Sequence, residues 1–460
     1  MPVSRSRRWP LTILAILLLS CLTLYRRESQ FAHLSSKHET EHICSLNLSS
    51  VDLHLTHPLS YGRLVIDVST DKRLNEKHRS KDLAVSVPKL QLLSPYTGFP
   101  FAGSNAECIS SAAIRVPRLA TSPVDASSLV FGVSTSLPRL EESLSAFAVW
   151  AAGTGTTIFA LVDGATREQA LNLTDRAAER GVSLNITTRH DREGATDGDR
   201  SFALIKHVYE QSSRHSTQWI GLIDDDTFFP SMPALKQHLD KYDATEPHYV
   251  GGLAEDLQQL QNFGVMAYGG GGIFLSMPLL RQLYSHYDEC NADRVEGGDK
   301  RIAECIYRFT TTKLSWDSLM HQCDFLSDAS GFYEADRPQP LSVHHWKSWN
   351  RVDVVGMSAV AAICGVDCVL QNFRLTDGWT LVNGFSIIKY SKEYAPGNME
   401  QTWPGGGDYR WSLGPLRQKD EGKISFRLEH VVVEKGQVRQ FYIRRDPAGD
   451  SLIEVVWRRR

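Results

Sequence analysis

The chain has 460 residues, enough for two or three domains or for one large α/β domain with additions. Apolar residues make up 42% and charged residues 22%, as in ordinary globular proteins, and the formal net charge is only −3. This balance lacks the basic excess typical of nucleic-acid binding, so we expect no nucleic-acid partner.

The N-terminus carries an uncharged stretch between two basic clusters. Residues 9–25 contain no charged side chain, and arginines stand at positions 5, 7, 8, 26 and 27. A span of this length suits the thinner membranes of the early secretory pathway, and no small-residue cleavage site follows it. We therefore predict a transmembrane signal-anchor at 9–25 and a cytoplasmic tail at 1–8, in preference to a cleaved signal peptide, with the rest of the chain in the lumen.

Sequons and cysteines agree with a lumenal location. Acceptor sequons for N-glycosylation begin at Asn47, Asn172 and Asn185. Seven cysteines follow the expected anchor, and their spacing lacks the paired motifs of zinc sites, so disulfides are the better interpretation. Because seven is an odd number, at least one thiol stays free or pairs with another chain.

The rest of the chain divides by its pattern. Residues 26–125 are polar and rich in turn formers, and we expect a stem and a loosely organised lead-in there. Expected strands are 129–134, 157–163, 182–187 and 219–223, and expected helices are 140–151, 165–179, 202–213, 277–287 and 300–309. This alternation predicts an α/β domain at 126–350, with a mostly parallel sheet covered on both faces. Short strand-like runs predict a small β-rich subdomain at 351–460.

Carboxylates follow two of the expected strands. Asp163 ends one of them, and Asp224, Asp225 and Asp226 directly follow another. Adjacent carboxylates repel one another unless a cation lies between them, and Mg²⁺ and Mn²⁺ bridge carboxylates and phosphates. Because ligands of such sheets bind beyond the carboxyl ends of the strands, the pattern indicates a metal–diphosphate site. The alternative is a solvated acidic turn.

Three later segments supply further candidates. Gly269–Gly272 precede an apolar strand and would let another group approach the backbone, although a flexible loop is equally typical. Asp299 precedes the last expected helix, either as its cap or as a functional acid. His344 and His345 stand in a last strand or loop, at 341–346, and are either structural residues or ligands.

Taken in order, these segments resemble glycosyltransferase family 31, the Fringe-like and core β1,3-transferases of the Golgi, over about residues 128–350. The similar segments are Ile158–Gly164, Trp219–Phe229 with the DxD acids, Gly269–Ser276, Gly298–Asp299 and His344. Gly298 departs from the family pattern, because it replaces the first acid of a pair. The Ser-Val-His-His-Trp stretch at 342–346 is most similar to uncharacterised fungal members.

The resemblance implies a GT-A fold, a UDP-sugar donor, a glycan or glycoprotein acceptor, Mn²⁺ or another divalent cation, and inversion at the anomeric carbon. It implies that Asp226, His344 and Asp224 bind the metal, with His321 as a competing histidine. The donor contacts that it implies come from Asp163, Asp224, Asp225, Gly270 and Gly271, and the implied catalytic base is Asp299. The expected location is the Golgi or ER membrane, as a single-pass type II protein.

Two other classes of function stay open. A non-catalytic Golgi lectin or scaffold on the same fold would retain the sheet and lose the base or the metal, and the departure at Gly298 is the reason to keep this alternative open. A metal-dependent phosphohydrolase would need more histidine and aspartate ligands to hold two metals, and we cannot assemble such a set from the sequence.

Overall fold

The computed structural model describes residues 53–74, 81–93, 107–120, 122–189, 196–212, 216–292, 295–395 and 397–460. The predicted tail and signal-anchor at 1–25 and the sequon at Asn47 lie outside these residues. None of the helices formed by the described residues is both long and apolar enough to cross a membrane. The membrane anchor and the Golgi location therefore stay predictions.

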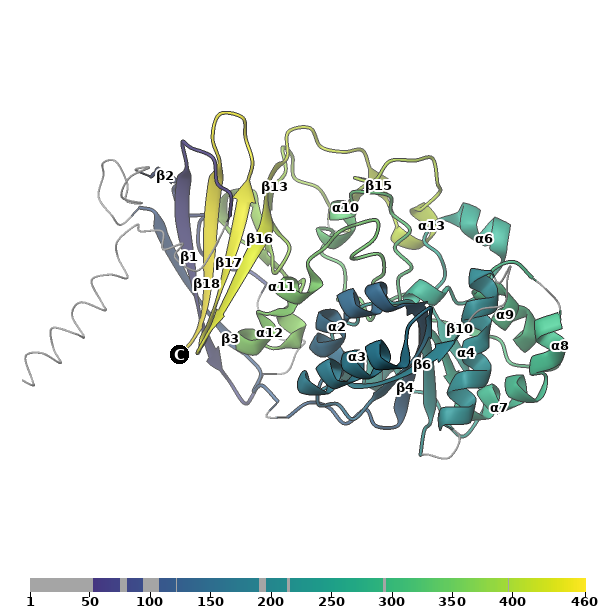
Figure 1. Cartoon of the computed structure of the whole chain (residues 1–460). Coiled ribbons are helices and arrows are strands. Elements are labelled where there is room, and N and C mark those ends of the chain that lie inside the picture. Colours follow the sequence, from purple (N-terminus) through teal and green to yellow (C-terminus); the bar gives the residue numbers. More distant parts are fainter. Residues whose placement is uncertain are drawn as a thin grey trace, which may run out of the picture.

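A seven-stranded sheet forms the centre of the α/β part, in the order β10-β8-β9-β7-β4-β5-β6 (Figure 1). β4 runs parallel to both β5 and β7, β5 runs parallel to β6, and β10 runs parallel to β8, whereas β9 is antiparallel to its neighbours. The predicted mostly parallel sheet is confirmed. The strands are β4 (Leu129–Ser136), β5 (Thr157–Asp163), β6 (Ser183–Arg189), β7 (Trp219–Ile223), β8 (Tyr249–Gly251), β9 (Ile273–Ser276) and β10 (Leu314–Trp316).

Helices cover both faces of this sheet, as the alternation in the sequence predicts. Leu129, Phe131 and Val133 of β4 share one hydrophobic core with α2 (Leu137–Ala151) and α3 (Arg167–Glu179). Val130, on the opposite face, shares a second core with α4 (Asp197–Ser212), α7 (Met277–Ser285) and α9 (Gly298–Phe309). Successive residues of a strand point to opposite faces, so the first five residues of β4, which are all buried and carry no polar side chain, require a layer on each side.

The chain reverses its direction across the sheet at β4. From β4 it adds β5 and β6 on one side, and later it adds β7 on the other side. Connections that diverge in this way leave a crevice beyond the carboxyl ends of the two strands. Ser136 ends β4 and stands just before α2, and Asp224 follows β7, so both strands deliver polar side chains to this crevice.

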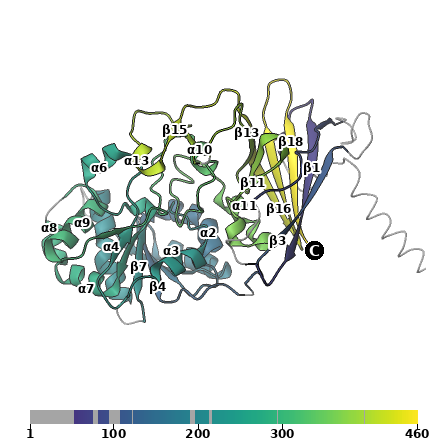
Figure 2. The same ribbon diagram turned by 180° about the vertical axis from the view of Figure 1, so that it is seen from behind.

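A nine-stranded sheet forms the other end of the molecule, as both views show (Figures 1 and 2). β1 (Ser60–Thr70) runs parallel to β18 (Ser451–Arg459) on one side and to β3 (Ile109–Val116) on the other. The prediction of a loosely organised lead-in is therefore wrong for β1 and β3. β1 has its partner β18 at the far end of the chain, β3 pairs only with β1 among the described strands, and pattern within a short window does not reveal such long-range pairing.

The remaining strands of this sheet are β2 (Gln91–Leu92), β11 (Asn372–Arg374), β12 (Trp379–Val382), β13 (Ser386–Lys389), β16 (Ile424–Glu434) and β17 (Gln437–Arg444). The predicted β-rich character of 351–460 is confirmed, but the region is not a small separate unit. One hydrophobic core contains Trp150 and Phe229 of the α/β part together with Ile453 and Trp457 of β18. Between the parts, α11 (Val354–Ser358) packs on α2 and β16, and α12 (Ala361–Cys364) packs on β17 and β18.

Disulfides reinforce two helix ends. Cys290 of α8 (Tyr287–Ala292) pairs with Cys305 of α9, and Cys364 of α12 pairs with Cys368. The predicted disulfides are therefore confirmed, and Cys323 is a buried cysteine that pairs with no other cysteine among the described residues. The other short elements are α5 (Met232–Leu239), α6 (Leu257–Phe263), α10 (Ser330–Tyr333), α13 (Arg410–Leu413), β14 (Met399–Glu400), β15 (Leu416–Arg417), and the 3₁₀ turns η2 (Gly269–Gly271), η3 (Val366–Cys368) and η4 (Thr376–Gly378).

Candidate metal and donor site

The acid triplet forms a tight turn directly after β7. Thr227 holds this turn, because its hydroxyl accepts a hydrogen bond from the Asp224 amide at 3.1 Å and donates one to the Gly270 carbonyl at 3.0 Å. Asp224 points outward, with 51% of its side chain exposed, whereas Asp225 and Asp226 are buried. The three identical residues therefore have different surroundings, and they can have different roles.

The chain that carries the late histidines runs alongside this turn. Phe228 and Val343 exchange backbone hydrogen bonds of 2.8 and 2.9 Å, which form a single bridge, so the segment is a loop, one of the two predicted possibilities. Consecutive side chains of an extended chain would point to opposite sides. His345 instead adopts a left-handed φ of +64°, and the rings of His344 and His345 lie with their centroids 3.7 Å apart. Both imidazoles consequently face Asp226.

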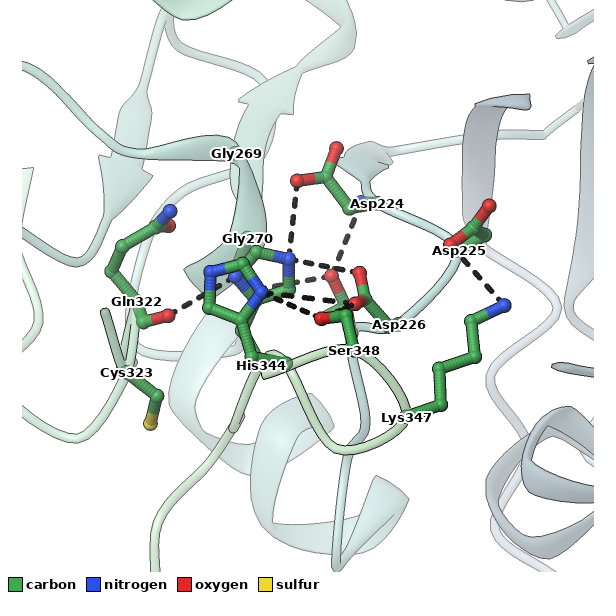
Figure 3. Close-up of polar contacts among 12 residues, drawn as sticks. Asp224, Asp225, Asp226, Gly269, Gly270, Gln322, Cys323, His344, Lys347 and Ser348 are labelled. Atoms are coloured by element: carbon green, nitrogen blue, oxygen red, sulfur yellow. Dashed lines mark hydrogen bonds and ion pairs between the residues drawn. The ribbon is translucent and has the colours of Figure 1, made fainter. Parts of the chain in front are cut away.

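Asp226 is the point on which the site converges. His344 Nε2 lies 2.9 Å from one oxygen of Asp226 and 3.3 Å from Asp224 (Figure 3). His345 Nδ1 lies 3.8 Å from the other oxygen of Asp226, and Ser348 donates a hydrogen bond of 2.6 Å to that oxygen. Burial alone would raise the pKa of Asp226, but its bonds with the two histidines and Ser348 hold that pKa well below its ordinary value.

The hydrogen bonds of His344 leave a place for a cation. Its Nδ1 lies 3.1 Å from the Gln322 carbonyl oxygen, which can only accept, so Nδ1 carries a hydrogen. Nε2 then faces two carboxylates and needs either a second proton or a metal ion. Burial lowers the pKa of His344, but Asp224 and Asp226 outweigh burial and raise it well above its ordinary value. Within the described residues, Asp226, His344 and His345 offer buried ligand atoms within 4.8 Å of one another, and this donor set fits a divalent cation.

Asp225 faces the opposite way, toward α2. Arg139 binds both of its carboxylate oxygens, at 2.5 and 2.8 Å, and Thr135 also donates to it. Lys347 Nζ lies 3.3 Å from the same carboxylate (Figure 3). Asp225 is therefore neutralised by the protein's own cations, and it holds the half-exposed Arg139 guanidinium beside the crevice.

An open cleft with a volume of about 560 Å³ lies beyond the carboxyl ends of β4, β5 and β7. The acid triplet, both late histidines, Arg139 and Asp163 line it. Asp163 binds Arg189 at 2.8 Å and lies 3.7 Å from Arg200, so its carboxylate also stands among cations. A cleft of this size accommodates a ligand of about the size of a drug or a nucleotide.

The glycine run is required because side chains of the site occupy the space beside it. A Cβ on Gly270 would stand 2.0 Å from His344 Nδ1, and a Cβ on Gly269 would stand 2.8 Å from an oxygen of Asp299. A Cβ on Gly271 would meet no atom closer than 3.4 Å, which is an ordinary contact. Groups do approach this backbone closely, and at Gly269 and Gly270 they are the protein's own Asp299 and His344. The donor contacts of Gly270 and Gly271 stay predictions.

Asp299 stands in the first turn of α9 and faces the glycine run. Its Oδ2 accepts a hydrogen bond of 2.7 Å from the Gly269 amide. Gly297 is the N-cap of α9, so the interpretation of Asp299 as the helix cap is wrong. Burial, together with the charge of Asp224, raises the pKa of Asp299 to about 7. A carboxyl group with this pKa can take up or release a proton near neutral pH.

His321, the competing histidine, has other partners. Its Nδ1 pairs with Glu255 at 2.9 Å, and its ring packs edge-on against Phe332. The structure therefore brings His344, and not the imidazole of His321, to the acid triplet. The sequon residues Asn172 and Asn185 are both exposed, and their glycosylation stays a prediction.

Sequence reasoning missed four residues that organise the site, namely Arg139, Asp324, Lys347 and Ser348. Arg139 lies in α2 and Asp324 lies in an irregular segment, and neither stands in a recognisable motif. Lys347 and Ser348 follow the two histidines closely in the chain, so nearness to the candidate ligands is the signal that could have found them.

Comparisons with known proteins give a partial match. Residues 258–363, less than a quarter of the chain, match the model of a family described as "Protein of unknown function, DUF604". This segment includes the glycine run, Asp299, His321 and both late histidines. No curated protein matches the chain.

Several solved glycosyltransferases resemble the chain distantly. One is GlyE of Streptococcus pneumoniae TIGR4, with 13% sequence identity and a TM-score of 0.31, where the match covers 48% of this chain and 56% of GlyE. Another is the galactosyltransferase LgtC in complex with donor and acceptor sugar analogues, with 12% identity and a TM-score of 0.31, where the match covers 47% of this chain and 86% of LgtC. A third is mouse xyloside xylosyltransferase 1 in its apo form, with 10% identity and a TM-score of 0.32, where the match covers 47% of this chain and 96% of that enzyme. The chain spans about half the length of GlyE, and similarity at this level carries no argument for an activity.

Proposed function

We propose that this protein is an inverting, metal-dependent glycosyltransferase of the Fringe-like type, with a GT-A fold. It moves a sugar from a UDP-sugar to a glycan or glycoprotein acceptor. The observation that carries the proposal is the buried group of Asp226, His344 and His345 at the crevice between β4 and β7. The β1,3 linkage rests on the sequence resemblance alone.

The donor half of the site follows from the charges that line the cleft. Asp226, His344 and His345 would hold Mn²⁺ or a similar cation, which supplies positive charge to a diphosphate leaving group. Arg139 adds a fixed guanidinium that Asp225 keeps in place. Asp224 is exposed beside this group and can accept hydrogen bonds from sugar or ribose hydroxyls. Asp163, at the end of β5, is our candidate for the nucleotide end of the donor.

The acceptor half requires a base, and we assign this role to Asp299. Inversion by a single displacement needs one group that takes the proton of the attacking hydroxyl. Asp299 is held against the glycine run next to His344, and its pKa of about 7 lets the carboxylate form accept a proton near neutral pH. The Gly269 amide fixes the orientation of the carboxylate during this transfer.

The departure at Gly298 has a packing reason, which weakens the case for a non-catalytic lectin. A Cβ on Gly298 would stand beside the Cβ of Ser201 in α4, closer than any real contact. Glycine therefore lets α9 pack closely on α4, and the neighbouring Asp299 keeps its place beside the glycine run. The loss of the first acid does not remove the candidate base.

The proposal is tested with the purified full chain, a panel of UDP-sugars and Mn²⁺. We expect one donor to be hydrolysed slowly to UDP, faster with the right acceptor, and we expect EDTA to stop the reaction. UDP binding without hydrolysis or transfer of any donor would favour the lectin alternative. Absence of UDP binding under all conditions would overturn the proposal. The proposed type II orientation in the Golgi or ER is tested separately, by protease protection of a C-terminally tagged chain in microsomes.

A further inference from the structure

His345 has two nitrogens with different neighbours. Its Nε2 lies 3.1 Å from a carboxylate oxygen of Asp324, which can only accept, so Nε2 carries the hydrogen. In the neutral ring Nδ1 then carries the lone pair, and Nδ1 lies 2.9 Å from Ser348 Oγ and 3.8 Å from Asp226. Asp324 thus decides which nitrogen of His345 is available toward the centre of the site.

The hydroxyl of Ser348 cannot satisfy both of its neighbours. It has one hydrogen, and two acceptors lie within reach, an oxygen of Asp226 at 2.6 Å and Nδ1 of His345 at 2.9 Å. Because this hydrogen goes to Asp226, Nδ1 of His345 has no donor from Ser348. As at His344, either a second proton or a cation completes the arrangement, and a cation that contacts both Asp226 and His345 does so without a direct hydrogen bond across the 3.8 Å between them.

The ring of His345 is also fixed in place by packing. It lies between His344, at a centroid distance of 3.7 Å, and Trp349, at 3.9 Å and nearly parallel. The left-handed backbone at His345 is uncommon for a residue other than glycine, although histidine adopts it more readily than most residues. The stacking, the hydrogen bond to Asp324 and the backbone conformation together direct Nδ1 of His345 toward Asp226.

We infer that Asp324 is the positioning residue that directs His345 toward the cation, as one of its three protein ligands. The inference rests on the metal site of the proposed function, and it adds a preference of that site for some divalent metal ions over others. Imidazoles bind transition-metal ions in preference to Mg²⁺, which favours oxygen ligands and retains its waters. A site with two imidazoles and one carboxylate consequently binds Mn²⁺ and Co²⁺ more tightly than Mg²⁺.

The test measures metal binding without any nucleotide. Mn²⁺, Co²⁺ and Mg²⁺ are titrated into the full chain by calorimetry, and Mn²⁺ binding is followed independently by electron paramagnetic resonance. Asp324→Asn should weaken Mn²⁺ binding by about ten- to a hundredfold, as loss of a partner behind a ligand does elsewhere, and should lower the Mn²⁺/Mg²⁺ affinity ratio by a similar factor. His345→Asn tests the ligand itself, and asparagine tolerates the left-handed backbone.

Asp317→Asn is the matched control. Asp317 contacts His238 at 3.0 Å and is about as buried as Asp324, but the pair lies outside the cleft lining. This variant should retain the wild-type ratio. An unchanged ratio in Asp324→Asn and His345→Asn, with firm Mn²⁺ binding by the wild type, would overturn the inference and leave the proposed function standing. A wild-type chain that binds none of the three ions would instead overturn the metal in the proposed function itself.

Discussion

Gly270→Ala is the most informative small change in the site, because one added methyl group meets the central imidazole. The new Cβ would stand 2.0 Å from Nδ1 of His344. Ordinary contacts need about 3.5 Å, so the ring or the glycine turn must move by about 1.5 Å. His344 cannot move so far and keep both its 2.9 Å contact with Asp226 and its 3.1 Å contact with the Gln322 carbonyl.

We expect two consequences of this displacement. Overpacking with the loss of a buried hydrogen bond should lower the free energy of unfolding by about 2–4 kcal/mol, measured by urea denaturation. Affinity for UDP in the presence of Mn²⁺ should fall by at least about tenfold, because metal sites tolerate only small errors in ligand position. Isothermal titration calorimetry measures this affinity, and circular dichroism confirms that the variant is folded.

The neighbouring glycine supplies the control. Gly271→Ala adds the same methyl group one position later, where no atom lies closer than 3.4 Å, and it should leave the free energy of unfolding nearly unchanged. The double change Gly270→Ala with His344→Ala removes the clash, so it should recover stability relative to Gly270→Ala without recovering UDP binding. If Gly270→Ala is as stable as Gly271→Ala and binds UDP in Mn²⁺ as tightly as the wild type does, the placement of His344 against the glycine turn is refuted.

Two further predictions concern the base and the buried acid. Asp299→Asn should spare UDP binding and abolish transfer, and full turnover in this variant would reject Asp299 as the base. In the wild type, kcat/KM should rise with pH through about 7, because the carboxylate form, which accepts the proton, predominates above the pKa of Asp299. Lys347→Met leaves Asp225 buried with one cation fewer, so the free energy of unfolding should fall by about 1–3 kcal/mol in urea titrations, and an unchanged midpoint would show that Arg139 alone suffices.

Much of the α/β part could be predicted from local pattern. β5 and β7 were placed at their observed bounds, because a continuous apolar run ended by acids is an unambiguous signal in a short window. The helix expected at 277–287 instead ends at Ser285, and a second helix, α8, begins at Tyr287. The pairing of β1 with β18 could not be predicted, since the two strands lie at opposite ends of the chain.

The site divides in the same way. The acid triplet and the glycine run can be recognised in the sequence as clusters of one residue type, and the family resemblance adds His344 and Asp299 to the predicted site. The distinct environments of the three aspartates could not be predicted, because they depend on contacts with residues far away in the chain. Arg139 of α2 binds Asp225, and Ser348 donates a hydrogen bond to Asp226. The sequence also leaves the choice among His321, His344 and His345 open, because the contacts of Glu255 with His321 and of Asp324 with His345 join distant segments.

The proposed mechanism depends on a divalent cation that helps to bind the diphosphate of the donor. Measuring UDP affinity with and without Mn²⁺ tests this dependence most directly. Calorimetry on the wild-type chain should show firm UDP binding in Mn²⁺, little binding after EDTA treatment, and the same weak binding for Asp226→Ala in either condition. UDP affinity that is equal in Mn²⁺ and in EDTA, or that is undiminished in Asp226→Ala, would contradict the proposed mechanism.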